Sequence, residues 1–281
     1  MTFSVVVPVF NELSVLQLSV PALLLELESH DVELVYVCNG CVDGSAKYLR
    51  ETLAGRGLVV DLAEASKTEA LNRGDAVATS FPRFYLDADV VVSVGVFEQL
   101  LSVLKSGRFD LVSPHVLFDK SLSSKLAAMI MGVWESLPHG QLDGFHHLLG
   151  LSRRGRQLWG RFPRITGDDA FITSHIPTER RKVVTEAVVS TWAPRTYWSW
   201  VKVRARWARG HRELREMGIR EPQTPSQGKA LLRLLGRVSS WPGVLLYLSA
   251  RSFGLIYNFA TRRSRVGWYR DRGGESTYRR T

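Results

Sequence analysis

The feature that most constrains this chain is a short β-branched run, ended by polar residues, that recurs along its first half. The runs are FSVVVPVF, VELVYVC, GLVVDLA, RFYLDADVVV and DLVSP. Apolar residues between them have helical spacing, as in Leu16, Val20, Leu23, Leu24 and Leu27, or in Ala70, Leu71, Ala76 and Val77. This alternation predicts an α/β fold with a parallel sheet covered on both faces. Ligands of such sheets bind at the carboxyl ends of the strands.

Polar side chains follow four of these predicted strands, where the sheet would gather them along one edge. The first run is followed by Asn11 and Glu12, and the second by Asn39 and Asp43. Past the third stand Glu64 and Lys67, and past the fourth Asp87 and Asp89. Four such motifs in order predict a binding site rather than four unrelated turns.

The fourth motif, YLDADV, carries the strongest local signal. Asp87 and Asp89 are separated by one residue just past a strand, so one carboxylate can face a divalent ion and the other a ligand group. Oxygen ligands of this kind suit Mg²⁺ or Mn²⁺, which keep open positions for substrate phosphates. The alternative is a solvated turn at the end of a strand.

Charge is distributed unevenly along the 281 residues. Residues 1–194 carry 18 Lys and Arg against 22 Asp and Glu, whereas residues 195–281 carry 19 against 5. The basic last third suits phosphates, anionic lipid or nucleic acid.

Two cysteines form no disulfide framework, and MTFSVVVPVF does not read as a secretory signal, so a reducing, cytoplasmic location is expected.

The ordered motifs FSVVVPVFNE, VYVCNGCVDGSAKYL, KTEALNRGDAVA, FYLDADVVV and TGDDAFI resemble those of the family 2 glycosyltransferases of GT-A fold. The resemblance covers roughly residues 2–169 and reaches Trp207 if RARWARG is included. It implies a Rossmann-like, mostly parallel sheet and an inverting transferase. The donor would be a UDP- or GDP-linked sugar, the cofactor Mg²⁺ or Mn²⁺, and the acceptor a sugar, a lipid-linked glycan or a small molecule.

The resemblance also implies a donor side of the site. Pro8, Asn11 and Glu12 would line the nucleoside pocket. Asn39 stands where the family has an acidic pair, and it would hydrogen-bond the base, with Asp43 nearby. Lys67 and Asn72 would lie near the base or the diphosphate. Asp87 would face the ribose or the metal, and Asp89 would bind the metal.

The two cysteines of CNGC have the spacing of a redox site or of half a zinc site. A redox site needs an exposed thiolate at a helix N-terminus, and zinc needs a second pair of ligands. Cys38 and Cys41 are therefore interpreted as small packing residues in the wall of the nucleotide pocket.

The resemblance places the catalytic and acceptor side later in the chain. Asp169 matches the family's catalytic aspartate, the general base that takes a proton from the acceptor hydroxyl, and Asp168 replaces the usual Glu. Arg206 would hold the diphosphate and Trp207 would stack on the acceptor, although Val203 stands in place of a glutamine. His211 would complete the metal shell. Gly150 would belong to a glycine loop on the acceptor side, and the neighbouring histidines, His146 and His147, match no metal spacing.

Simpler alternatives to these catalytic and binding roles stay open. Asp168 and Asp169 could cap the following helix, and the segment around Trp207 could be a basic surface helix. A sugar-phosphate nucleotidyltransferase would share the sheet but needs a glycine-rich loop where PVFNEL stands. A catalytically inactive relative and a protein that binds anionic polymers also remain open, although no nucleic-acid partner is expected.

We predict a GT-A catalytic domain over residues 1–218, with 1–115 binding the donor and 116–218 supplying the acceptor side and the base. Residues 219–281 would form a basic, amphipathic helical tail. In it Lys229, Arg233 and Arg237 share one helix face, and WPGVLLYLSARSFGLIYNFA contains a central Arg251. Three arrangements stay open: the tail lies on an anionic membrane at the cytoplasmic face, packs on the catalytic domain, or spans a bilayer.

Overall fold

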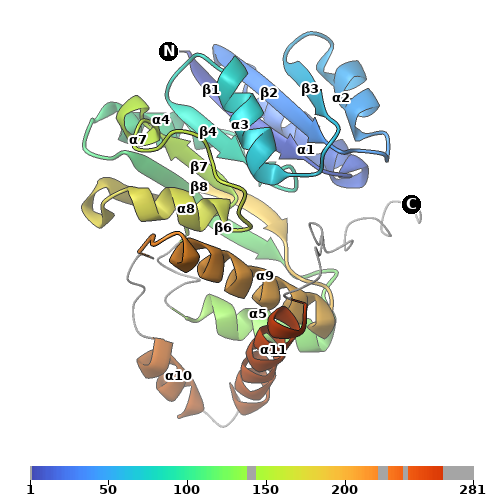
Figure 1. Ribbon diagram of the computed structural model, residues 1–281, viewed down its shortest axis with the longest axis vertical. Coiled ribbons are helices and arrows are strands. Elements are labelled where there is room, and N and C mark those ends of the chain that lie inside the picture. Colours follow the sequence, from blue (N-terminus) through green and yellow to red (C-terminus); the bar gives the residue numbers. More distant parts are fainter. Residues whose placement is uncertain (1, 138–143, 221–226, 237–239, 262–281) are drawn as a thin grey trace. The chain divides into compact units, whose positions relative to one another are not determined.

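The computed structural model describes residues 2–137, 144–220, 227–236 and 240–261 (Figure 1). Contacts group these residues into two compact units, which are described separately below. The first comprises residues 2–117 and 145–191, and the second the described parts of 118–144 and 192–261. The division at residue 218 stays a prediction.

The first half of the sheet is parallel, as the sequence predicts. Strands β1 (Phe3–Val9), β2 (Val32–Asn39), β3 (Leu58–Leu62) and β4 (Arg83–Leu86) alternate with helices α1 (Leu13–Glu26), α2 (Ser45–Leu53) and α3 (Lys67–Val77). In this half β1 pairs with both β2 and β4, and β2 also pairs with β3. All seven residues of β1 are buried, which explains why its sequence is apolar apart from Ser4 rather than alternating.

The second half of the sheet is antiparallel where pairing is defined. It contains β5 (Val91–Val92), β6 (Leu111–Asp119), β7 (Leu148–Leu151) and β8 (Arg181–Trp192), and the spatial order is β3-β2-β1-β4-β7-β6-β8-β5 (Figure 1). β7 pairs antiparallel with β4 and with β6, and β5 pairs antiparallel with β8. The predicted α/β fold is confirmed, and the strands after residue 90 make the eight-stranded sheet mixed.

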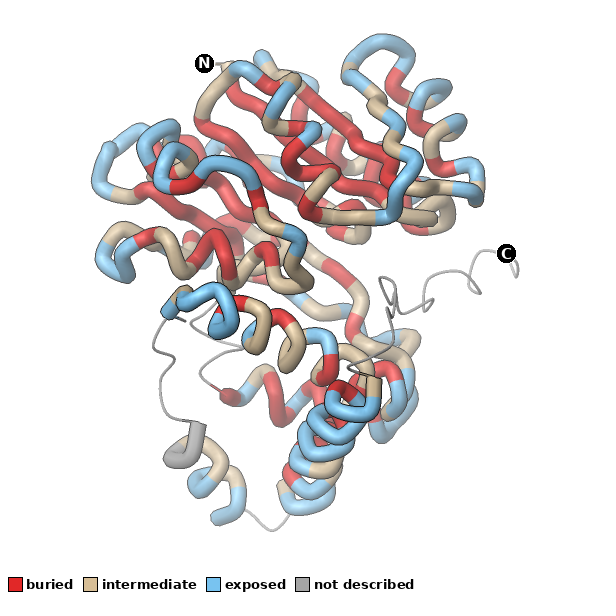
Figure 2. The backbone as a smooth tube through the Cα atoms, viewed as in Figure 1, coloured by how far each residue is buried: buried red, intermediate tan, exposed pale blue. Residues whose placement is uncertain are grey.

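Helices pack closely on this sheet, whose strands are largely buried (Figure 2). α3 contacts β1 and β2, and a Cβ atom at Gly74 would come within 2.2 Å of Val6. Phe97 of α4 (Val96–Lys105) packs with Phe3 and Phe84, with ring centroids 5.3 and 4.9 Å away. Burial of each such ring contributes roughly 1.5–3 kcal/mol.

The first unit also contains α7 (Arg153–Arg156), α8 (Asp168–His175) and the 3₁₀ turn η1 (Thr178–Arg180). α8 begins directly at the two aspartates of the predicted catalytic motif. Its position therefore fixes where those carboxylates lie.

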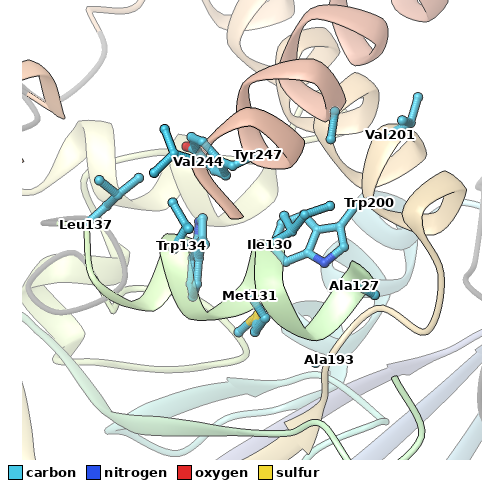
Figure 3. Close-up of a cluster of buried hydrophobic side chains, with 12 residues drawn as sticks. Ala127, Ile130, Met131, Trp134, Leu137, Ala193, Trp200, Val201, Val244 and Tyr247 are labelled. Atoms are coloured by element: carbon cyan, nitrogen blue, oxygen red, sulfur yellow. The ribbon is translucent and has the colours of Figure 1, made fainter. Parts of the chain in front are cut away.

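The second unit is helical. It contains α5 (Lys125–Glu135), α9 (Tyr197–Glu216), α10 (Gln227–Leu235) and α11 (Trp241–Ala260). α11 packs on α9 and α5 around a buried cluster that includes Trp134, Trp200 and Tyr247 (Figure 3). The predicted helices of the tail are present, but the side chain of Lys229 and all of Arg237 lie outside the described residues. In the part of the chain described, no helix has the length and hydropathy to cross a bilayer.

Candidate functional site

The candidate site lies in the first unit, where the carboxyl ends of the parallel strands meet. Asp87 and Asp89 follow β4, and Lys67 opens α3 just after β3. The side chain of Ser66 caps this helix by accepting the N–H of Glu69 at 3.3 Å, so Lys67 occupies its first turn.

Lys67 joins two carboxylates that are distant in sequence. Its Nζ lies 2.6 Å from Asp87 Oδ1 and 2.9 Å from Asp168 Oδ2. The three side chains are 14%, 27% and 11% exposed, so the charges are partly withdrawn from water. Lys67 was expected near the base or diphosphate of a donor, and the structure adds a role in holding the carboxylates together.

Burial and charge shift the pKa values of these groups in different directions. Burial lowers the pKa of Lys67, but Asp168 and Asp87 outweigh it and hold that pKa above its usual range. Burial raises the pKa of Asp87, but Lys67 outweighs it and the net shift is downward. At Asp168 burial raises the pKa by more than the charge of Lys67 lowers it. Together with the nearby Asp169 and Asp87, burial raises this pKa to about 6.

A histidine completes this cluster. His147 Nδ1 lies 3.3 Å from Asp87 Oδ2, and the backbone N–H of Asp87 donates to the carbonyl of His147 at 2.8 Å. Burial lowers the pKa of His147, but its hydrogen bond and charge interaction with Asp87 outweigh burial and raise it. Burial lowers the pKa of the adjacent His146 to about 3, which keeps that imidazole neutral.

Asp87, Asp89 and His147 could together hold a metal ion. One ligand atom from each lies within 4.8 Å of the other two. Two carboxylates and an imidazole form a mixed oxygen and nitrogen set that fits a divalent ion such as Mn²⁺. Asp89 is fixed in turn by β8, since Thr191 Oγ1 donates to its carbonyl at 3.1 Å.

The place of His147 beside Asp87 and Asp89 was not predicted from the sequence, because it depends on strand pairing. No metal spacing links residue 147 to residues 87 and 89. Antiparallel pairing of β7 with β4 places them side by side, with Leu86 opposite Leu148. The one available signal was that His147 immediately precedes an apolar run.

A small recess opens among these side chains. Its polar lining consists of Lys67, Asp87, His147, Asp168 and Asp169. Its apolar lining consists of Pro8, Leu71, Tyr85, Leu86 and Leu149. The structure thus brings together six residues predicted for the site from sequence: Pro8, Lys67, Asp87 and Asp89 with Asp168 and Asp169.

The two aspartates of α8 differ in environment. Asp168 is buried and bound to Lys67, whereas Asp169 is more exposed and its Oδ1 accepts the N–H of Ala170 at 2.8 Å. The N-cap position is Gly167, so neither aspartate is the N-cap residue. Both carboxylates line the same recess.

Asn72 supports the segment that leads to these aspartates. Its amide donates to the carbonyl of Phe162 at 3.0 Å and accepts the N–H of Phe162 at 2.8 Å. Arg156 holds the same segment through the carbonyls of Trp159 and Gly160, at 2.8 and 2.9 Å. Asn72 was expected near the donor, but its side chain is buried and engaged with the backbone.

Asn39 and Asn11 tie the ends of β1 and β2 together. Asn39 is 2% exposed, donates to the carbonyl of Val9 at 2.7 Å, and accepts the N–H of Ser66 at 3.0 Å. Asn11, at φ 53°, accepts the N–H of Val42 at 2.8 Å. In this arrangement both amides shape the corner at the strand ends, and their contact with a base stays a prediction.

Asp43 organises two helix starts beside that corner. Its carboxylate accepts the N–H groups of Leu13 and Ser45, both at 3.0 Å, and Ser45 in turn accepts the N–H of Glu12 at 3.0 Å. Burial raises the pKa of Asp43, but these hydrogen bonds outweigh it and lower the pKa. Its predicted contact with the donor remains to be tested.

The cysteines are free thiols within the same corner. Cys38 is 1% exposed, while Cys41 accepts the N–H of Asn11 at 3.4 Å and donates to the carbonyl of Val9 at 3.3 Å. Both thus lie among the packed groups that join β1 to β2.

Gly150 lies within β7 instead of in a loop. A Cβ atom there would come within 2.3 Å of the Phe84 ring and 2.9 Å of Val112, so close packing requires glycine. A role for Gly150 in binding an acceptor stays a prediction.

Arg206, Trp207 and His211 lie on α9, in the second unit. Trp207 packs against Trp134 and Trp200, with ring centroids 6.1 and 6.4 Å away. Their predicted roles toward diphosphate, acceptor and metal remain predictions.

Comparison with known families decides the relationship of this chain. Residues 4–143 match the family described as Glycosyl transferase family 2. Over that segment the chain belongs to glycosyl transferase family 2. None of the curated proteins matches the chain in sequence.

Solved structures place this family 2 chain in the GT-A fold. A mannosyltransferase from Pyrobaculum calidifontis, PcManGT, in complex with GDP-Man and Mn²⁺ is 16% identical with a TM-score of 0.59, covering 93% of this chain and 75% of its own. S. aureus TarS is 13% identical with a TM-score of 0.51, covering 73% of this chain. The chain spans 38% of that TarS chain. TarS 1–349 in complex with UDP is 12% identical with a TM-score of 0.53, covering 74% of this chain and 64% of its own.

Proposed function

We propose that this chain is an inverting glycosyltransferase that moves a sugar from a nucleotide-diphosphate donor to an acceptor hydroxyl, assisted by a divalent cation. One observation carries the proposal. Lys67, Asp87, His147, Asp168 and Asp169 converge from four segments on one recess at the carboxyl ends of parallel strands. Family membership over residues 4–143 supports the transferase class.

The donor is proposed to bind with its diphosphate beside Asp87, Asp89 and His147. A divalent ion held by these ligands would neutralise the charge that develops on the departing nucleoside diphosphate. PcManGT in complex with GDP-Man and Mn²⁺, and TarS in complex with UDP, support a UDP- or GDP-linked donor. Lys67 keeps Asp87 ionised and therefore ready to act as a ligand.

Asp169 is proposed as the general base. Lys67 fixes Asp168, the preceding residue, and the hydrogen bonds of Asn72 fix the segment before it. Asp169 is thereby presented to the recess from a rigid helix start, where it would accept the proton of the acceptor hydroxyl as the new bond forms. Arg206, Trp207 and His211 are proposed for diphosphate, acceptor and metal on motif resemblance alone.

A thermal-shift panel of UDP- and GDP-sugars, with and without Mn²⁺, tests the donor proposal. We expect one donor to raise Tm only when Mn²⁺ is present, and Asp89→Ala to abolish that shift and donor hydrolysis. Asp61→Ala, outside the recess, is the control and should leave both unchanged. Full metal-dependent activity in Asp89→Ala would refute the metal assignment.

Asp169→Asn separates binding from chemistry. This variant should keep the donor-induced shift in Tm and lose sugar transfer by at least a hundredfold, in line with loss of a general base. Transfer at the unmodified rate would move the base elsewhere. Release of pyrophosphate from a nucleoside triphosphate and a sugar phosphate would instead favour a nucleotidyltransferase.

A further inference from the structure

Helix α11 of the second unit is apolar on its outward as well as its inward side. Its inward side is buried against α9 and α5 through Gly243, Val244, Tyr247, Ala250, Gly254 and Asn258. A helix on the surface of a soluble domain normally turns a polar face outward. α11 does not, so its outward face needs another explanation.

Six large apolar side chains form that outward face, which we name the apolar stripe: Trp241, Leu245, Leu248, Leu255, Ile256 and Phe259. Steps of four, three, seven, one and three residues keep them within about 100° of arc on the helix, away from most of the buried set. Each is between 38% and 68% exposed, and most of the tube of α11 in Figure 2 has the pale blue of exposed residues. Single exposed apolar residues are common, but a contiguous row marks a docking surface.

Charge indicates the chemistry of the partner. α11 contains Arg251 and no acidic residue. Residues 195–281 carry 19 Lys and Arg against 5 Asp and Glu, and the 20 residues after Thr261 carry seven arginines against two acids. An apolar helix face within a strongly basic segment matches the combination that binds anionic lipid at a membrane interface.

We infer that the apolar stripe docks on the surface of a bilayer containing anionic phospholipid. α11 would lie in the interface with Trp241, Leu245 and Ile256 toward the acyl boundary. Insertion across the bilayer is not required, which agrees with the absence of a spanning helix among the described residues. A second copy of the chain is a poorer occupant, because its docking would bring two strongly basic segments together.

Vesicle flotation with the full chain tests the inference. Vesicles of 70:30 phosphatidylcholine and phosphatidylglycerol are compared with pure phosphatidylcholine, at low and high salt. The variants are Leu245→Gln and Leu255→Gln. The matched control is Leu58→Gln on β3, at a leucine that is 49% exposed and lies in the first unit. Circular dichroism and Tm check the fold of each variant.

We expect the wild type to float with the anionic vesicles and not with the neutral ones. Each stripe variant should lower the partition coefficient at least about tenfold, as loss of one buried leucine implies, and the control should stay within twofold. Equal flotation on both vesicles, or stripe variants that bind like the control, would overturn the inference. So would a wild-type dimer that Leu245→Gln converts to a monomer without any vesicle binding.

Discussion

Replacing Asp168 with asparagine should stabilise the fold while weakening the site. The raised pKa means that the folded protein holds a proton on Asp168 more tightly than the unfolded chain does. The associated stability is complete below the ordinary pKa of 3.8 and is lost as the pH rises toward about 6. The difference between 3.8 and about 6 corresponds to about 3 kcal/mol at 1.36 kcal/mol per pKa unit. Asparagine mimics the neutral form, so Asp168→Asn should recover up to about 3 kcal/mol above pH 6.

Urea unfolding in the presence of a chelator, at pH 4, 6 and 7.5, measures this gain. Asp168→Asn should match the wild type near pH 4 and exceed its free energy of unfolding most at pH 7.5. Asp75→Asn is the matched control, a largely buried carboxylate whose ion pairs should stabilise the fold. Its side chain is 10% exposed and bridges Arg83 and Arg156 at 2.8 and 2.7 Å. Breaking that buried network should cost about 3–5 kcal/mol.

An Asp168→Asn variant that is less stable than the wild type at pH 7.5, by more than about 1 kcal/mol, would refute this prediction. That result would mean that the ion pair with Lys67 outweighs burial, so that the pKa of Asp168 is lowered in the folded protein. A gain that does not depend on pH would instead show that asparagine stabilises the site for reasons unrelated to ionisation.

Two further predictions concern the support of the site and of the sheet. Asn72→Ala removes both hydrogen bonds to Phe162 and should lower the free energy of unfolding in urea by about 1–3 kcal/mol. Sugar transfer should also slow, and an unchanged transfer rate would show that these hydrogen bonds do not position Asp169. At Glu33 burial raises the pKa, but hydrogen bonds from Thr79, Ser80 and Ser4 outweigh it and lower the pKa to about 2. The stability that the ionised Glu33 contributes is present above pH 4.5 and is lost as the pH falls toward 2. Glu33→Gln should therefore lower the free energy of unfolding by about 2 kcal/mol at pH 7, after allowance for solvent screening, and leave it unchanged in acid. Equal unfolding curves of variant and wild type at pH 7 would contradict this prediction.

Much of the fold could be predicted from local patterns. The β-branched runs and the helical spacing between them specify the parallel strands, because a strand buried on both faces needs a continuous apolar run. Asp87 and Asp89 could be placed by the same logic, since they directly follow such a run. The GT-A assignment was confirmed by the neighbouring structures.

The antiparallel half could not be predicted in the same way. β7 is four residues long and pairs with β4 through a register that no local pattern specifies. For this reason His147 was overlooked and Gly150 was assigned to a loop.

The roles of the polar residues were also only partly predictable. Asn39 and Asn72 have the hydrogen-bonding groups of ligand contacts, but the folded chain engages them with Val9, Ser66 and Phe162. A buried amide must satisfy its donors and acceptors, and the sequence does not say whether backbone or substrate will do so.

The contact between the Asp87 carboxylate and the His147 imidazole joins parts of the chain on opposite sides of residue 143, where the family match ends. A chimera that took residues 1–143 from one relative and the remainder from another would retain the parallel strands but set an unrelated side chain beside Asp87. Positions 87, 89 and 147 should therefore vary in concert among relatives. Transferring donor preference from one such enzyme to another would therefore require exchanging residues 1–143 together with the segment that contains residue 147.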